Sequence, residues 1–440
     1  MSCRALPKRA DPRDALTRYI AAADNSRPPS KGIATEMEFD SPRDILRHRP
    51  FQFFFVTRSF SRFASQISTV AIGWQIYDLT GSALYLGLAG LTQFLPTAIL
   101  VFVAGHVADR YDRRRVLQAC QSVEGLTAVA LALGNFLGIL TVPWIFAALA
   151  VLGTATAFES PATAAILPAV APPGRLQQAT ALSTGGNQMA TIVGPALGGF
   201  VYAISPGVPY ALMTVLWFLA SILTRFIHFE RPAQPKEMPT LGALFGGVRF
   251  VRDNPTILGV ISLDLFAVLF GGATALLPIY ARDILQTGPW GLGLLRAGPA
   301  VGALAMTVVL AHLSINRRVG LRMFQAVIAF GVATIVFALS TEIWLSLLAL
   351  AAMGAVDTVS VVIRFSLVQL STPDDMRGRV GAVNYLFVNA SNQLGEFESG
   401  VVAAWLGAVP AVLLGGVATI LIALTWMRLF PTLRKVERLE

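Results

Sequence analysis

The sequence predicts an all-helical membrane protein with two sets of six spans, and three observations support this fold class. Hydrophobic residues make up 55% of the chain and charged residues only 13%, whereas a soluble domain carries about 25% charged residues. Basic residues gather in alternate connections between long apolar runs. Alternating ten-residue strand patterns are absent from the sequence, which excludes an outer-membrane barrel. The runs without charge, several of which exceed the ~20 residues that cross a bilayer as a helix, are 82–104, 125–158, 176–224 and 401–426.

The hydrophobic runs predict twelve spans and five regions of the chain. The spans are expected near 51–77, 82–107, 116–139, 142–170, 179–204, 208–229, 257–281, 290–313, 320–340, 343–370, 379–404 and 406–430. The regions are a disordered cytoplasmic tail at 1–48, a six-helix bundle at 49–229, a cytoplasmic central loop at 230–256, a second six-helix bundle at 257–430 and a cytoplasmic tail at 431–440. Two sets of six helices joined by such a loop are typical of parallel repeats in a transporter.

The two halves also share a faint sequence similarity. Pro172 and Pro373 are 201 residues apart, and so are Gly194 and Gly395. Each pair occupies the same span number in its half, so the positions indicate an internal duplication.

The positions of the basic residues predict the orientation of the chain. Lys and Arg are missing from the connections near 80, 140, 206 and 406. This asymmetry is the positive-inside pattern and predicts that both termini and the central loop are cytoplasmic. It also accounts for the net charge of +9, so the sequence does not predict a nucleic-acid partner. The basic residues of the other connections include Arg110, Arg113, Arg114, Arg115, Arg175, Arg225, Arg231, Lys236, Arg249, Arg252, Arg317, Arg318, Arg322, Arg377 and Arg379.

Several kinds of chemistry are not indicated by the sequence. Cys3 and Cys120 cannot form a disulfide framework, and the four His residues lie at span ends without metal-ligand spacing. No phosphate-binding Gly-Lys-Ser/Thr loop is present, so we expect no ATP-driven transport, no cofactor, no metal and no enzymatic activity. The first fifty residues contain no apolar core of signal-peptide length. Because Met37 stands just before the first span, we expect residues 1–36 to be dispensable, and loss of transport on their deletion would contradict this.

The connection between the second and third spans carries a recognisable motif, Gly105-His-Val-Ala-Asp109-Arg110-Tyr-Asp112-Arg113-Arg114-Arg115. It resembles the signature of the major facilitator superfamily, with Asp112 where a second Gly is usual. Gly105 would let helices approach closely, Asp109 would cap a helix N-terminus and Arg113 would reach a partner carboxylate on the cytoplasmic face. Such contacts would latch an outward-open state. The alternative is an ordinary cytoplasmic loop that is basic only because of the positive-inside rule. The predicted gating residues here are Gly105, Asp109, Arg110, Arg113 and Arg114.

A second motif lies in the fifth span, where Gly194-Pro195-Ala-Leu-Gly198-Gly199 resembles the Gly-Pro-x-x-Gly-Gly core associated with exporters of the superfamily. Small residues permit close helix packing and Pro195 kinks the span, so both gating and plain packing would use these residues.

Three further stretches resemble the enterobactin-exporter branch of the superfamily, also described as transmembrane secretion effectors. They are Tyr77-Asp78-Leu-Thr-Gly-Ser82, Glu159-Ser-Pro-Ala162 and Thr372-Pro-Asp-Asp-Met-Arg377-Gly-Arg-Val380, and the resemblance covers about 48–430. It implies a major facilitator fold in a bacterial inner membrane, alternating access and energisation by the proton gradient.

Ionisable residues within the spans are expected to line the substrate and proton pathway, because such groups are costly at bilayer depth. Arg58, Arg62 and Gln66 form one polar stripe on the first span. Arg58 and Arg62 could instead reach the cytoplasmic interface. Asp357 and Arg364 lie seven residues apart on the tenth span and hence share a face. Other spans carry Glu159, Asp264, Asn389, Asn392, Gln393 and Glu396.

One of these acids is the candidate proton carrier, and the alternative for Glu159 and Asp264 is structural pairing with Arg62 or Arg364. The polar seam of span eleven could contact substrate or hold helices together. We therefore expect a monomeric secondary transporter that exports small amphipathic molecules by proton antiport. The alternatives are a lipid flippase and a membrane ligand sensor without transport. Substrate identity is left open by the sequence.

Overall fold

The computed structural model describes residues 42–228, 241–313, 317–374 and 376–438, except for the side chains of 42–44, 101, 102, 109 and 241–245. Contacts divide the chain after Asp44, and residues 45–440 form one compact unit. The tail predicted to be disordered ends earlier than expected, because Pro42–Arg47 form the short helix α2. Residues 1–41 of that predicted tail lie outside the described residues.

Each of the six predicted spans of the first half coincides with one helix of the described chain. Pro50, Pro143 and Pro209 stand in the first turn of α3, α6 and α8, where the backbone N–H that proline lacks would have no helical partner. The helix α3 ends at Gly81, whose φ of 60° is the left-handed conformation that glycine adopts easily. The helices are α3 (Arg49–Thr80), α4 (Ala83–Arg110), α5 (Arg113–Phe136), α6 (Val142–Val170), α7 (Leu176–Ile204) and α8 (Val208–Thr224).

The second half repeats this count, but its first span is broken. The run predicted as one helix near 257–281 is α10 (Pro255–Phe270), a 3-10 turn η1 (Ala273–Leu276), α11 (Leu277–Ile279) and a π-helical turn η2 (Tyr280–Ile284). The break falls at Gly271 and Gly272, two residues that weaken a helix. The other five spans are α12 (Gly288–His312), α13 (Val319–Leu339), α14 (Ile343–Leu370), α15 (Arg377–Leu406) and α16 (Ala408–Leu429).

Two predicted connecting regions contain ordered structure. The segment 230–256, predicted as a loop, contains the helix α9 (Leu241–Asp253) and the start of α10. The C-terminal segment 431–440, predicted as a tail, contains α17 (Pro431–Arg434). Leu433 is fully buried, and the backbone N–H of Gly320 donates to the carbonyl oxygen of Val436 at 3.0 Å. Buried apolar contact therefore orders residues that the charge pattern assigned to solvent.

Eight stretches among the described residues are long and apolar enough to cross a membrane by length and composition. The helices α3, α7 and α15 are as long, with 32, 29 and 30 residues, but polar side chains lower their hydropathy. The helix α8 is apolar and has 17 residues. Of these three helices, α3 and α15 carry most of the predicted pathway residues, and α7 carries the predicted exporter motif.

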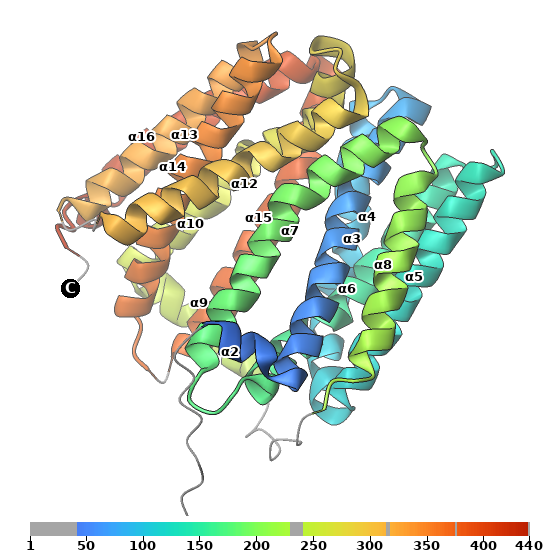
Figure 1. Ribbon diagram of the computed structural model, residues 1–440. Helices are drawn as coiled ribbons and strands as arrows, with labels where there is room; N and C mark the ends of the chain where they lie inside the picture. The colour runs from blue at the N-terminus through green and yellow to red at the C-terminus, as the bar shows by residue number, and fades with distance from the viewer. Residues whose placement is uncertain (1–41, 229–240, 314–316, 375, 439–440) are drawn as a thin grey trace, which may run out of the picture. The chain divides into compact units, whose positions relative to one another are not determined.

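The helices form two bundles, α3–α8 and α10–α16, which Figure 1 shows as a blue-to-green group and a yellow-to-red group. The bundles meet along two helix pairs, α7 with α12 and α4 with α15. We call the end of the unit that carries the connections 111–112, 171–175 and 371–376 the basic end, and the end with the connections 81–82, 205–207 and 340–342 the opposite end. The long helices α3–α7 and α12–α16 run from one end to the other.

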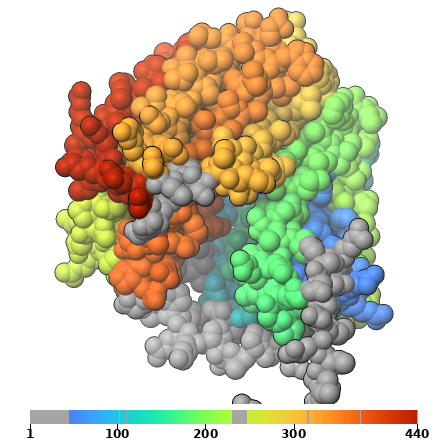
Figure 2. Space-filling model, turned by 60° about the vertical axis from the view of Figure 1, so that its left-hand side comes forward, coloured from blue at the N-terminus to red at the C-terminus, as the bar shows by residue number. Residues whose placement is uncertain are grey.

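Among the described residues, the buried core that the two bundles share lies at one end of the unit. A continuous core at the opposite end combines residues of both bundles, such as Tyr77, Tyr210, Tyr280 and Phe337. At the basic end the second bundle has its own core around Phe324. The first bundle has a separate core there, which includes Phe51, Phe54 and Ile166. The bundles therefore separate toward the basic end, and Figure 2 shows a recess between the green helix α7 and the orange helices of the second bundle.

Candidate functional site

The second bundle encloses a cavity of about 490 Å³ near the basic end, which we call the second-bundle cavity. Its walls come mainly from α10, α14 and α15, and the apolar part of the lining consists largely of valine side chains. Polar groups gather at specific points of this apolar wall, which is the usual composition of a small-molecule site. The polar and charged residues of the lining are Asp264, Asp357, Arg364, Gln369, Thr372, Arg377, Asn384, Tyr385 and Asn392.

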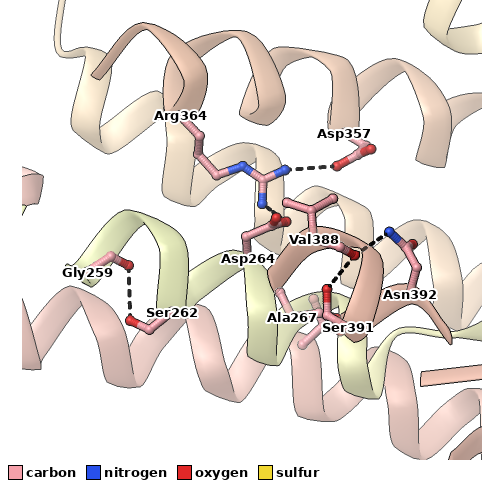
Figure 3. A network of polar contacts seen from close by, with 10 residues as sticks. Gly259, Ser262, Asp264, Ala267, Asp357, Arg364, Val388, Ser391 and Asn392 are labelled. Carbon is pink, nitrogen blue, oxygen red and sulfur yellow. Dashed lines mark hydrogen bonds and ion pairs between the residues drawn. The ribbon is translucent and has the colours of Figure 1, made fainter. Parts of the chain in front are cut away.

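Arg364 joins two carboxylates in the cavity wall (Figure 3). Its Nη1 donates to Oδ1 of Asp264 on α10, and its Nη2 lies 3.6 Å from Oδ1 of Asp357, two turns earlier on α14. The side chains of Arg364 and Asp264 are only 10% and 9% exposed, whereas that of Asp357 is 47% exposed. Asp264 thus holds the guanidinium from the buried side, and Asp357 meets it from the cavity.

This ionic triad carries one more negative charge than positive charge when both acids are ionised. A buried pair is retained when its geometry and hydrogen bonds offset desolvation, and the Asp264–Arg364 pair fits that description. Asp357 is less tightly held and faces the cavity. The arrangement gives the cavity one acid that can gain or lose a proton, or bind a ligand, without removing the buried pair.

The first bundle holds a second charged cluster. Glu159 on α6 accepts a hydrogen bond from the hydroxyl of Ser61 on α3 at 2.7 Å. Arg58 interacts electrostatically with Arg62 and Glu159. The Nε atoms of Arg58 and Arg62 are buried without a hydrogen-bond partner in the described chain. The predicted stripe of α3 is thus partly buried in its own bundle. The third residue of that stripe, Gln66, donates to the Thr191 hydroxyl on α7 at 3.1 Å.

Glu124 belongs to this cluster and was missed by the sequence analysis. It lies on α5 with 2% exposure, interacts with Glu159, and its Oε2 has no partner in the described chain. A signal was present in the sequence, because Gln118, Gln121 and Glu124 recur every three residues on an otherwise apolar helix. Glu124 therefore adds a second acid beside Glu159 to the charged cluster of the first bundle.

The polar seam predicted on span eleven is divided between two places. Asn392 lines the second-bundle cavity, and its amide donates to the carbonyl oxygen of Val388 at 2.8 Å. Asn389 is exposed and donates to the carbonyl oxygen of Tyr385 at 2.8 Å. Gln393 and Glu396 instead point at Gly90 on α4, so this part of α15 faces the other bundle.

Glu396 and Arg296 line the same small cavity of about 70 Å³ between the bundles, which we call the seam cavity. The charges of the two side chains act on each other. Arg296, on α12, lies beside Gly73 of α3, and its Nε is buried without a hydrogen-bond partner in the described chain. Sequence analysis also missed Arg296, although it is the single Lys or Arg in the eighth span.

The predicted exporter motif of α7 packs on two different helices. Gly194 and Gly198 face α3, where an added Cβ would lie 2.6 Å from Cβ of Gln66 and 3.1 Å from Cα of Ile67. Gly199 faces the second bundle, and a Cβ there would lie 2.4 Å from the carbonyl oxygen of Pro289 on α12. Pro195 is buried inside the helix. The motif therefore packs closely both on α3 within the first bundle and on α12 of the second bundle.

The basic-loop motif differs from its prediction at two positions. The backbone of Asp109 lies in the last turn of α4, and its side chain lies outside the described residues; the residue that caps α5 is Asp112, which accepts from the N–H of Arg114 at 3.0 Å. An N-cap must directly precede the helix, and Asp109 does not. An added Cβ on Gly105 would meet nothing within 4 Å, because the bundles are apart at this end.

The arginines of this motif make backbone contacts. Arg113 donates to the carbonyl oxygens of Ala108 and Ala165 at 3.3 Å. Arg114 donates to that of Ile227 at 3.0 Å, whereas Arg110 is exposed.

At the opposite end, a polar network ties the end of α3 to the η2 turn. Arg282 donates to the carbonyl oxygen of Tyr77 at 3.2 Å and lies 3.4 Å from Oδ1 of Asp78. Its guanidinium lies 5.5 Å from the centre of the Tyr77 ring, and the Tyr77 hydroxyl donates to Oδ2 of Asp283. We call Tyr77, Asp78, Arg282 and Asp283 the end latch, because it joins the two bundles.

Comparison with known proteins places the chain in a family. Residues 41–440 match the family model described as "Transmembrane secretion effector". The chain is 26% identical over 401 residues to the enterobactin exporter EntS of Citrobacter koseri, covering 90% of this chain and 95% of that protein. It is also 26% identical over 407 residues to the uncharacterized MFS-type transporter YvqJ of Bacillus subtilis, again with 90% and 95% covered.

Solved structures show the same fold. A bacterial homologue of the human lysosomal transporter Spinster, inward-facing, has a TM-score of 0.66 at 14% identity and covers 88% of this chain and 96% of that one. A bacterial homologue of the iron transporter ferroportin, also inward-facing, has a TM-score of 0.63 at 17% identity and covers 85% and 98%. The predicted major facilitator fold is confirmed. The chain belongs to the transmembrane secretion effector family of major facilitator transporters, a family of secondary transporters and not of enzymes.

Proposed function

We propose that this transporter exports small amphipathic organic molecules, siderophore-like or drug-like, across a bacterial cytoplasmic membrane by proton antiport. The observation that carries the proposal is the second-bundle cavity, in which a half-exposed carboxylate, Asp357, shares Arg364 with the buried Asp264. Valines and Phe365 in the same wall suit an apolar body, and the amides of Asn384 and Asn392 suit polar substituents. The 26% identity to an enterobactin exporter favours the outward direction.

Proton coupling is assigned to Asp357 in this proposal. With the cavity open to the basic end, which is the cytoplasmic end in this proposal, Asp357 releases its proton to that side and pairs with Arg364, while the cavity admits substrate. After the transition, Asp357 takes a proton from the other side and its attraction to Arg364 weakens. Substrate leaves as the proton binds, so the proton moves inward and the substrate outward. Asp264 keeps the guanidinium in place throughout.

Alternating access follows from the two ends of the unit. The shared core and the end latch close the opposite end, and the separate cores leave the basic end open. In the reverse state the latch opens and the basic ends approach, which would give Gly105 the close contact that it lacks here. The gating roles of Gly105, Arg110, Arg113 and Arg114 belong to that second state.

The test is accumulation of a panel of dyes and siderophores in inverted membrane vesicles, with and without a pH gradient. We expect gradient-driven accumulation by the unaltered protein and loss of the gradient dependence in Asp357→Asn. Arg62→Ala tests the first-bundle cluster in the same assay and should lower transport. Asp253→Asn is the matched control, because Asp253 is an exposed acid on α9 paired with Arg249.

Three outcomes would overturn the proposal. Unchanged gradient dependence in Asp357→Asn would remove this acid from proton coupling. Transfer of labelled lysophospholipid between leaflets, without dye or siderophore transport, would indicate a flippase. Saturable substrate binding without accumulation would indicate a membrane sensor.

A further inference from the structure

The first bundle has a groove on its surface between α4 and α5. Both helices pack along α6 but contact each other little, which leaves a hollow of about 470 Å³ that is lined by α5, by α6 and by Val107 near the end of α4. Its lining is apolar and includes Val116 and Val123 of α5 and Val151 and Phe158 of α6. The hydroxyl of Thr154 in the wall donates to the carbonyl oxygen of Ala150 at 2.8 Å, so it does not require water. An apolar hollow of this kind suits a hydrocarbon chain.

A second hollow of about 440 Å³ continues the groove to the basic end. The two hollows share Val107, Val116 and Ala119. The wall of the second hollow carries Arg110 and Arg115, both exposed, at the end of α4 and in the first turn of α5. Cationic and apolar surfaces are thus continuous along one groove.

The wall of the second hollow also carries an acid, Asp112, which pairs with Arg114 rather than with Arg110 or Arg115. Asp112 accepts from the N–H of Arg114 at 3.0 Å and forms an ion pair with its Nη2 at 3.1 Å. Arg110 and Arg115 form no ion pair or side-chain hydrogen bond with another residue in the described part of the chain. Within the described part of the chain, the groove thus carries two arginines without an ion-pair partner next to an apolar hollow.

We propose that this groove binds an anionic phospholipid, with an acyl chain between α4 and α5 and the phosphate between Arg110 and Arg115. Basic pockets between membrane helices at the cytoplasmic side recognise such head groups, and each arginine near the surface contributes roughly a fivefold change in affinity. A soluble anion would use only the basic hollow and would leave the apolar hollow unfilled. The inference does not depend on the transported substrate or on proton coupling.

The experiment is native mass spectrometry of the purified transporter reconstituted in nanodiscs of phosphatidylglycerol or phosphatidylcholine with identical acyl chains. We expect the unaltered protein to retain phosphatidylglycerol in preference to phosphatidylcholine. Arg110→Gln/Arg115→Gln should lower that preference about twenty-five-fold, from two arginines at fivefold each. Ala150→Phe, which fills the apolar hollow, should reduce retention of both lipids at this site.

The control is Arg428→Gln/Arg434→Gln, which removes two exposed positive charges at the same end from α16 and α17. It should keep the preference. Equal retention of the two lipids by the unaltered protein, or equal losses in control and groove variants, would overturn the proposal. Binding of glycerol phosphate that displaces the lipid would show a soluble-anion site instead and would also overturn it.

Discussion

Two acids that bind the same arginine differ in what surrounds them. Asp264 and Arg364 are buried together, whereas Asp357 is half-exposed in the cavity wall. An acid that is already paired in a buried site cannot lose its charge without leaving the arginine unpaired. An acid that faces a cavity can. The difference in exposure is the reason that stability should depend on Asp264 and transport on Asp357.

Asp264→Asn should therefore destabilise the protein more than Asp357→Asn does. Removing one partner of a buried ion pair costs about 3–5 kcal/mol, and that cost applies to the Asp264–Arg364 contact. Thermal unfolding of both variants in the same detergent measures it. The double variant Asp264→Asn/Arg364→Gln should recover part of the loss, because it removes the unpaired charge. Equal unfolding temperatures for the two single variants would contradict the assignment.

The seam pair Arg296–Glu396 should behave as a coupled unit. In a double-mutant cycle of Arg296→Gln and Glu396→Gln, we expect a coupling of about 0.5–3 kcal/mol in unfolding free energy, as for residues that share a cavity. The exposed pair Arg249–Asp253, 3.8 Å apart, is the control and should couple by less than about 0.5 kcal/mol. Additive effects at the seam would show that the two charges do not interact.

Among the elements, α7 shows how a single helix serves two contacts. Gly194 and Gly198 pack within the first bundle, and Gly199 brings α7 against α12 of the second. Close approach at a seam requires small residues, because a side chain would separate the helices. Gly185 on the same helix lies toward the basic end, and an added Cβ there would meet nothing within 4 Å.

Gly199→Val should weaken closure of the opposite end, whereas Gly185→Val should not. A Cβ at Gly199 would lie 2.4 Å from the carbonyl oxygen of Pro289, so α7 and α12 must move apart. The expected result is slower transport with an altered population of the two states, and Gly185→Val is the matched control. Both variants can be compared by transport rate and by protease accessibility of the opposite-end connections. Equal transport in the two variants would contradict the proposed seam contact.

The seventh span shows the limit of reading elements from hydropathy. Its apolar run is continuous, so the composition predicts one helix, but the chain breaks it after Phe270. The glycines Gly271 and Gly272 weaken the helix at this point. Gly272 packs closely against Gly395 on α15, because an added Cβ at Gly272 would lie 2.8 Å from the carbonyl oxygen of Gly395. The pairing depends on two segments more than a hundred residues apart, which a local pattern does not contain.

At the scale of the whole unit, one shared core and the end latch favour the state with the opposite end closed. Tyr77, Asp78, Arg282 and Asp283 come from the two bundles, and all but the buried Tyr77 are exposed. Contacts of this kind are individually modest. They matter because a difference of ~1.4 kcal/mol between two states changes their ratio tenfold.

Tyr77→Phe/Arg282→Ala should shift the population toward the state with the opposite end open. We expect a change of about fivefold or more in the ratio of states, from a loss of ~1 kcal/mol. Spin labels at Leu137 and Leu339 report the opposite end, and labels at Leu176 and Leu313 report the basic end, since all four residues are exposed. Distances should increase at the first pair and decrease at the second. Arg428→Ala is the control, and unchanged distances in the latch variant would rule the latch out.

Much of this protein could be predicted from the sequence. Long apolar runs define spans because a helix satisfies its own backbone hydrogen bonds in lipid. Eleven of the twelve predicted spans each coincide with one helix in the described chain, and the seventh is broken. That Asp357 and Arg364 lie on the same helix face was predicted from their spacing of seven residues alone. The local stripe on α5 contained Glu124, and α12 contained Arg296, but a lone charge in an apolar run does not reveal its partner.

The sequence by itself therefore determined that the chain lies in a lipid bilayer. It also determined the number of spans, the family and the helix faces that carry charge, because each of these depends on composition or on spacing within one segment. Only the tertiary structure decided that Asp264 rather than another acid holds Arg364, that Glu396 meets Arg296 at the seam, and that the bundles close at the opposite end. These facts depend on side chains from segments about a hundred or more residues apart in sequence. Packing brings such residues together, and no local pattern encodes which of several chemically equivalent partners will meet.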